Sequence, residues 1–139
     1  MGKLENIIVS PQINIRQALK KMDELGEKTI LAADAKNRLL GTVTDGDIRR
    51  WILKGGGLQE KISRVMNTSP IFLKEGYSND KAKEGMAEEV IECIPVVDTN
   101  KRIVSAIWWL DFFTKKFSQH KSINIPVVIM AGGEGKRLN

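Results

Sequence analysis

The feature that most constrains the fold of this chain is an internal repeat. Residues 30–34 and 94–98 are both short apolar runs that end in aspartate, and they lie 64 residues apart. At the same spacing residues 7–53 align without a gap with residues 71–117, with eight identical positions and apolar character at many more. Because hydrophobic positions stay in phase over the whole stretch, we interpret the pattern as a duplicated structural unit.

The same order of elements, β-α-β-β-α, is predicted for both copies. Asn14 and Ser78 are suitable N-caps for the first helix of each copy, and Gly26 is a natural helix stop. The last helix of each copy is expected to begin near Asp45 or at Asp111. Apolar runs predict strands at 7–9, 29–33, 38–44, 71–73, 93–97 and 102–108.

Each copy is too small to be stable alone, which predicts that the two pack on each other. A unit of about 47 residues buries too little apolar surface for independent folding. Three consecutive glycines, 55–57, mark a linker because they supply flexible backbone and no core. The sequence therefore predicts one α/β (α+β) module made of two similar halves.

The composition is typical of a globular protein. Of the 139 residues 42% are hydrophobic, and 22 basic against 17 acidic residues give a net charge of +5, which favours anionic partners. No apolar run is long enough to cross a bilayer and the amino terminus lacks a secretory signal, so we expect a cytoplasmic protein without membrane contact. One cysteine and one histidine exclude an internal disulfide and a Cys/His zinc site, and the scattered basic pairs do not predict nucleic-acid binding.

Two sequence patterns resemble a known family. Residues 41–48, Gly-Thr-Val-Thr-Asp-Gly-Asp-Ile, resemble the closing signature of a CBS motif, and residues 94–98, Ile-Pro-Val-Val-Asp, resemble its middle strand. Two such motifs in tandem resemble a Bateman module, the regulatory unit of AMP-activated kinase and IMP dehydrogenase. The resemblance implies a CBS-domain pair with pseudo-two-fold symmetry, two potential clefts for adenosyl ligands, and pairing into homodimers. The implied organisation is CBS motif 1 at 4–54, a linker at 55–64, CBS motif 2 at 65–118 and a connector from 119 to 139.

A candidate nucleotide site lies in the first copy. An aspartate at a helix start offers two acceptor oxygens, the number needed by the two hydroxyls of a ribose, and the helix amino terminus attracts phosphate. The resemblance assigns Asp47 to the ribose of AMP, ADP or ATP, Thr44 to ribose or phosphate, and Lys28 to phosphate. The alternative is that Thr44 and Asp47 only cap their helix as a capping box. The apolar positions expected against the adenine base are Met66, Ile71 and Ile91.

The second copy departs from this pattern. Trp108 stands where the first copy has Thr44, and Glu92 stands where it has Lys28. An indole fills volume without offering a hydroxyl, and a carboxylate repels phosphate. We therefore expect Asp111 to act as an N-cap and the second cleft to be blocked or to bind a ligand without phosphate, which leaves one nucleotide site per chain.

The end of the chain carries a different pattern. Residues 125–139 read as an apolar strand that leads into a glycine-rich basic turn, which suits phosphate binding by backbone amides. The turn resembles the Ala-Gly-Gly-x-Gly-x-Arg-Leu signature of sugar-phosphate nucleotidyltransferases, with Gly132, Gly133, Gly135 and Arg137 in the nucleotide-binding positions. The resemblance implies a carboxy-terminal nucleotidyltransferase domain, mannose-1-phosphate guanylyl-like, which would hold Mg²⁺ with carboxylates. On this interpretation the sequence is a fragment without activity of its own; the alternative is a flexible tail.

Three functions follow from these patterns. The leading hypothesis is a regulatory module that binds an adenine nucleotide and controls the attached nucleotidyltransferase. A ligand-free CBS dimerisation scaffold for the same enzyme is the alternative, and a third interpretation treats the module as incidental to the enzyme. The aromatic residues that would form the scaffold's interface are Trp51, Trp108, Trp109, Phe112 and Phe113.

Overall fold

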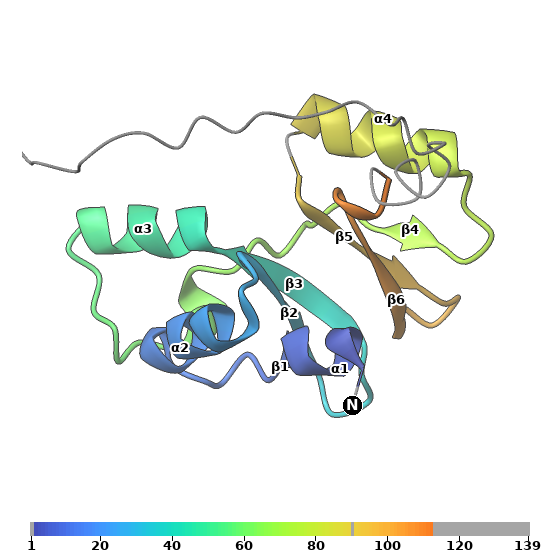
Figure 1. Cartoon of the computed structure of the whole chain (residues 1–139). Helices are drawn as coiled ribbons and strands as arrows, with labels where there is room; N and C mark the ends of the chain where they lie inside the picture. Colours follow the sequence, from blue (N-terminus) through green and yellow to red (C-terminus); the bar gives the residue numbers. More distant parts are fainter. Residues whose placement is uncertain (1, 90, 113–139) are drawn as a thin grey trace, which may run out of the picture.

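A computed structural model describes residues 2–89 and 91–112 as two three-stranded sheets with helices packed beside them (Figure 1). The first repeat consists of α1 (Lys3–Ile7), β1 (Ile8–Val9), α2 (Ile15–Leu25), β2 (Thr29–Ala33), β3 (Leu39–Thr44) and α3 (Asp45–Leu53). A short 3-10 helix, η1 (Ile62–Arg64), lies between the repeats. The second repeat consists of β4 (Leu73–Lys74), α4 (Asn79–Glu89), β5 (Cys93–Val97) and β6 (Ile103–Trp108).

The strand register shows that the two repeats are copies of one unit. In each sheet the central strand pairs in parallel with the first strand and antiparallel with the third. Thr29 pairs with Thr44 in the first sheet, and Cys93 pairs with Trp108 in the second, which is the 64-residue spacing of the sequence repeat. Both hairpins also have a register shift at equivalent positions. The predicted duplication and its pseudo-two-fold symmetry are therefore confirmed.

Local sequence signals fix both ends of α2. The Asn14 side chain accepts from the Gln17 amide at 2.8 Å, and Gln17 returns a bond to the Asn14 amide at 2.9 Å, which completes a capping box. At the other end Gly26 has a φ of 65°, the left-handed conformation that glycine adopts without steric cost. Both helix signals predicted from the sequence are confirmed.

The two repeats share a hydrophobic core. Leu31 from β2, Cys93 from β5 and Ile103 from β6 belong to one buried cluster, to which α1 contributes Ile7. Each repeat has a second cluster of its own, between its helices and its sheet. Because the shared cluster takes side chains from both sheets, burial of apolar surface holds the halves together.

The hairpin tips also join the repeats. The Leu39 amide donates to the Lys101 carbonyl at 2.9 Å, and the Ile103 amide donates to the Asn37 carbonyl at 3.0 Å. Asn37 and Lys101 occupy equivalent positions, and both have a φ of 61°. The contact therefore lies on the pseudo-two-fold axis.

Some elements differ from the sequence prediction. Ile7 was predicted to begin a strand, but it ends the unpredicted helix α1, where it is fully buried. The first strand of the second copy begins at Leu73, not at residue 71. In both copies the first strand has only two residues, because only two residues pair with the central strand.

The glycine run after α3 is packed against a tryptophan. A Cβ on Gly56 would lie 2.1 Å from the Trp51 ring, and the Trp51 indole donates to the Gly57 carbonyl at 3.1 Å. These glycines therefore allow a close approach, where the sequence suggested only a flexible spacer.

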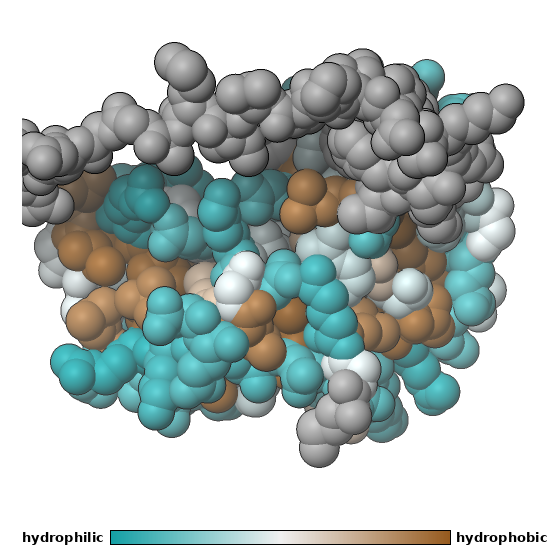
Figure 2. Space-filling model, viewed as in Figure 1, coloured by the Kyte–Doolittle hydropathy of each residue, from teal (hydrophilic) through white to brown (hydrophobic). Residues whose placement is uncertain are grey.

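The surface is mixed in character. On the face shown in Figure 2 apolar and polar residues are interspersed, and near the end of α3 the side chains of Ile52 and Leu53 are exposed. Within residues 2–89 and 91–112, no helix is both long and apolar enough to span a membrane.

Candidate functional site

A cleft of about 840 Å³ lies between the two repeats. The start of α3 and the end of β3 form one wall, and the other comes from the segment before β4 and the residues before β5. This volume lies in the range of small-molecule sites. All three residues that were predicted to contact the ribose and phosphate line this cleft: Lys28, Thr44 and Asp47.

Asp47 and Thr44 form the capping box that opens α3. The Thr44 hydroxyl accepts from the Asp47 amide at 3.1 Å, and Asp47 Oδ2 accepts from the Thr44 amide at 2.9 Å and from its hydroxyl at 2.7 Å. The second carboxylate oxygen, Oδ1, accepts from Arg50 at 2.6 Å. The capping alternative is thus present in the structure. It leaves Asp47 at the edge of the cleft, where a ribose would compete with Arg50 for Oδ1.

The predicted base-binding positions separate into two groups. Ile71 and Ile91 line the cleft from the side of the second repeat, as an adenine ring would require. Met66 does not line it; its side chain packs against the core of the first repeat. Met66 lies there because it follows η1 closely in the chain. Ile62 of η1 is fully buried in the core of the first repeat, so the turn after η1 also lies against that core.

Several cleft residues were not predicted. Thr42, Asn67 and Ser69 contribute polar atoms to the wall, and Arg49 and Arg50 extend along α3. Arg49 pairs with Asp45, and Arg50 pairs with Asp47. Each arginine follows its acidic partner by three or four positions at a helix start, and this spacing is the sequence signal that could have predicted the two ion pairs. From the sequence we expected both arginines on a solvated helix face.

Tryptophan occupies much of the second cleft. The Trp108 indole donates to Glu27 Oε2 at 3.0 Å, and the Lys3 ammonium lies 4.1 Å from the centre of the indole ring. Lys3 also pairs with Glu27 at 2.7 Å. The remaining cavity is about 350 Å³. The Trp108 amide donates to Asp111 at 3.1 Å, which is the bond that the Thr44 amide makes to Asp47 in the first repeat. An N-cap would accept from amides that follow it, so this bond gives Asp111 the position of Asp47 in the capping box and does not test the N-cap prediction.

Cys93 lies between the two clefts with its thiol buried. Burial, followed by the negative charge of Glu27, raises the pKa of Cys93 to about 12. A thiol is reactive as its thiolate, and the pKa in an unfolded chain is about 8.5. We expect alkylation by iodoacetamide at pH 8 to be slower than in the unfolded chain by a factor on the order of 1,000. Mass spectrometry would measure both rates, and equal rates would contradict the buried position.

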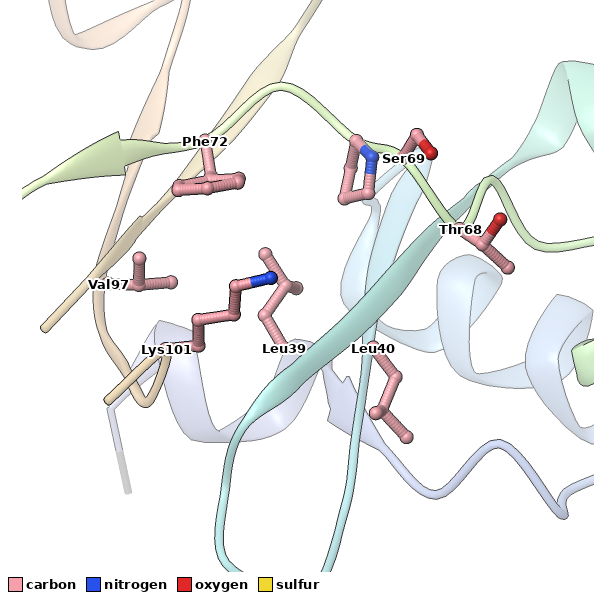
Figure 3. Close-up of a pocket in the computed structure, with 8 residues that line it drawn as sticks. Leu39, Leu40, Thr68, Ser69, Phe72, Val97 and Lys101 are labelled. Atoms are coloured by element: carbon pink, nitrogen blue, oxygen red, sulfur yellow. The ribbon is translucent and has the colours of Figure 1, made fainter. Parts of the chain in front are cut away.

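A smaller cavity of about 280 Å³ lies at the hairpin end of the repeat interface (Figure 3). Its walls are mixed: Leu39 lies toward Phe72 and Val97, and Thr68, Ser69 and Lys101 contribute polar atoms. The Lys101 ammonium lies 6.0 Å from the centre of the Phe72 ring. None of the residues expected to bind a nucleotide lines this cavity.

The loop predicted at the end of the chain lies outside the described residues, so Gly132, Gly133, Gly135 and Arg137 have no place in this geometry. Among the residues that the structure describes, no group of three or more His, Cys, Asp or Glu side chains is arranged to hold a metal ion.

Comparison with known proteins supports the fold and the class. Residues 3–54 match the family described as "CBS domain". A putative signal-transduction protein with CBS domains from Burkholderia ambifaria has a TM-score of 0.73 at 19% identity, covering 85% of this chain and 86% of the other. The first repeat thus matches the CBS-domain family, and the two-repeat fold resembles that of a solved structure with CBS domains, in agreement with the sequence prediction.

Two further solved structures were obtained with nucleotides. A CBS domain protein from Pyrobaculum aerophilum, complexed with AMP, has a TM-score of 0.69 at 19% identity, covering 80% of this chain and 89% of the other. The cytosolic domain of the Mg²⁺ channel MgtE, in complex with ATP, has a TM-score of 0.66 at 19% identity and covers 81% of this chain and 45% of the other.

The curated relatives include arabinose 5-phosphate isomerases. The relative from Shigella flexneri is 31% identical over 100 residues, which are 72% of this chain but only 31% of the isomerase. The chain therefore spans about a third of the length of this relative. These isomerases give no support to the predicted nucleotidyltransferase parent.

Proposed function

We propose that this chain is a regulatory module that binds an adenine nucleotide in the first cleft. The observation that carries the proposal is the meeting of Lys28, Thr44 and Asp47 in a cleft of about 840 Å³ between the repeats. Asp47 offers acceptors for a ribose, the amino terminus of α3 favours phosphate, and Ile71 and Ile91 offer apolar surface to the base. The neighbours in complex with AMP and ATP support the same class of ligand.

The regulatory step follows from where the ligand would sit. The cleft has walls from both repeats, so a nucleotide that contacts both favours one arrangement of the two halves. Binding then shifts the population toward that arrangement, and any domain coupled to the module responds.

Thermal unfolding with AMP, ADP, ATP and S-adenosylmethionine tests the proposal. A ligand at about 100 times its Kd stabilises the folded state by roughly 2.7 kcal/mol, which raises the Tm of a domain this size by about 3–6 °C. Asp47→Ala is expected to remove the shift, because the ribose loses its acceptor. We expect wild-type binding to saturate at one ligand per chain.

Asp111→Ala is the matched control for this experiment. It removes the equivalent carboxylate of the second repeat, including the bond from the Trp108 amide. Each variant loses a bond between a carboxylate and the amide three residues before it, which costs about 1 kcal/mol, so the comparison isolates the ligand. A shift that survives Asp47→Ala, or that disappears with Asp111→Ala, would place the ligand elsewhere.

We further propose that the partner of the module is an enzyme that acts on a sugar phosphate. The isomerases among the curated relatives support this class. Among enzymes of this class, the Ala-Gly-Gly-x-Gly-x-Arg-Leu pattern at residues 131–138 favours a nucleotidyltransferase. Assays of the full-length protein for nucleotidyl transfer and for sugar-phosphate isomerisation, each with and without AMP, distinguish the two reactions.

The dimerisation scaffold remains a second candidate because apolar side chains are exposed. Leu53 is 80% exposed and Leu110 is 69% exposed. Two members of the proposed interface are engaged within the chain, however: Trp108 contacts Lys3 and Glu27, and Trp51 donates to the Gly57 carbonyl. Analytical ultracentrifugation of the wild type and of Leu53→Ser tests this candidate. A stable dimer that needs Leu53 and binds no adenosyl ligand would favour the scaffold over the regulatory module.

A further inference from the structure

An ion pair between equivalent positions of the two repeats lines the first cleft. The Lys28 ammonium lies 3.2 Å from Glu92 Oε1, and the two residues are 64 positions apart. Their backbones are held alike, since the Asp45 amide donates to the Lys28 carbonyl at 3.0 Å and the Trp109 amide donates to the Glu92 carbonyl at 2.9 Å. The pair therefore follows from the pseudosymmetry and does not depend on a chance meeting of long side chains.

Every cation among the described residues that line this cleft is paired with a carboxylate. The three pairs are Lys28–Glu92, Arg49–Asp45 and Arg50–Asp47. Three positive charges face three negative ones, so the walls carry no net charge. A polyphosphate would meet a cleft that offers no surplus of positive charge.

Binding of a nucleotide would release two of these cations. A ribose hydroxyl on Asp47 Oδ1 takes the position of the Arg50 guanidinium, and a phosphate on Lys28 takes the position of the Glu92 carboxylate. The charge of one phosphate monoester, near −2, balances the charge of the two released cations, Lys28 and Arg50. Glu92 then remains beside the phosphate as an unpaired like charge, and its repulsion grows with each additional phosphate.

We propose that Glu92 is a specificity-determining residue that makes the first cleft prefer adenosine carrying one phosphate to its di- and triphosphates. This inference rests on the proposed function, because it assumes that the nucleotide binds with its ribose on Asp47 and its phosphate near Lys28. The chemical class of the ligand is accordingly a nucleoside monophosphate.

The expected size of the effect is moderate because water reaches the pair. The side chains of Lys28 and Glu92 are 72% and 58% exposed, so solvent screens their charges. Removing the negative charge of Glu92 is expected to strengthen AMP binding about 3- to 10-fold and ATP binding about 10- to 30-fold. Adenosine has no phosphate, so its affinity is expected to change less than about 2-fold. The gains for AMP and ATP shrink at high salt.

Isothermal titration calorimetry with adenosine, AMP and ATP tests the inference on the wild type, Glu92→Gln and Glu88→Gln. Glu88 is an exposed residue of α4 outside the cleft, so its substitution makes the same change in net charge and controls for long-range effects. The expected result is that the wild type binds AMP more tightly than ATP, that Glu92→Gln narrows this difference, and that Glu88→Gln leaves it unchanged.

The inference and the function on which it rests fail in different ways. Equal gains for adenosine, AMP and ATP in Glu92→Gln, or a wild type that prefers ATP, would overturn the role of Glu92 while leaving the nucleotide site intact. If none of the three ligands binds and Asp47→Ala changes nothing, the proposed function itself is wrong and the inference falls with it.

Discussion

Replacement of Gly41 by alanine is expected to lower the free energy of unfolding by about 2–3 kcal/mol. Gly41 lies in β3, and a Cβ at this position would be 2.5 Å from the Asn67 carbonyl oxygen. That carbonyl accepts from the Thr42 amide at 3.1 Å, and the Asn67 amide donates to the Thr42 carbonyl at 2.8 Å. The methyl group must push Asn67 away, which strains the strand and weakens both bonds. Urea unfolding followed by circular dichroism measures the loss.

The same substitution should also weaken nucleotide binding. Asn67, Ser69 and Ile71 belong to the segment that Gly41 holds against β3, and all three line the cleft. Gly85→Ala is the matched control: its Cβ would lie 4.0 Å from the nearest atom, Ile94 Cδ1, inside helix α4. Alanine there is expected to stabilise the protein by about 0.5–1 kcal/mol. A Gly41→Ala protein as stable as the wild type would mean that the segment is not fixed by this contact.

The elements of the fold were predictable where one local rule decided them. The 64-residue spacing predicted that both copies have the same order of elements, and in the structure the two hairpins also repeat the same register. Asn14 and Gly26 marked the ends of α2 because capping depends only on neighbouring residues. The helix α1 was missed because it has less than two turns, too few for a hydrophobic period to be recognised. The spacing of Leu4 and Ile7 is explained only by the shared core, in which both residues pack.

The candidate site was predictable in part for the same reason. Thr44 and Asp47 are neighbours on one turn, so their meeting needed only the helix start. The pairing of Lys28 with Glu92 depends on how the two sheets face each other, and composition and spacing say nothing about that. The sequence prediction placed Glu92 in the second cleft, and it does line that cavity, but its carboxylate also pairs with Lys28 in the first cleft.

The two cavities share some of their wall residues. Lys28, Glu92 and Cys93 border the nucleotide cleft and also the cavity beside Trp108. A phosphate that displaces Glu92 from Lys28 changes the charge next to the indole and its partners Lys3 and Glu27.

Substitution of Trp108 tests whether the indole fills the second cleft. Trp108→Ala is expected to lower the free energy of unfolding by about 3 kcal/mol, because a half-buried indole loses its packing and its contact with the Lys3 ammonium. Trp108→Phe keeps an aromatic ring for Lys3 but removes the donor to Glu27, so a cost of about 1 kcal/mol is expected. Because Glu92 remains in the wall, neither variant should gain a second nucleotide site. Urea unfolding and calorimetric stoichiometry with AMP measure the two effects. A cost below about 1 kcal/mol for Trp108→Ala would show that the indole is not packed in this cleft. A second AMP bound per chain in either variant would show that the indole, and not Glu92, is what blocks the second cleft.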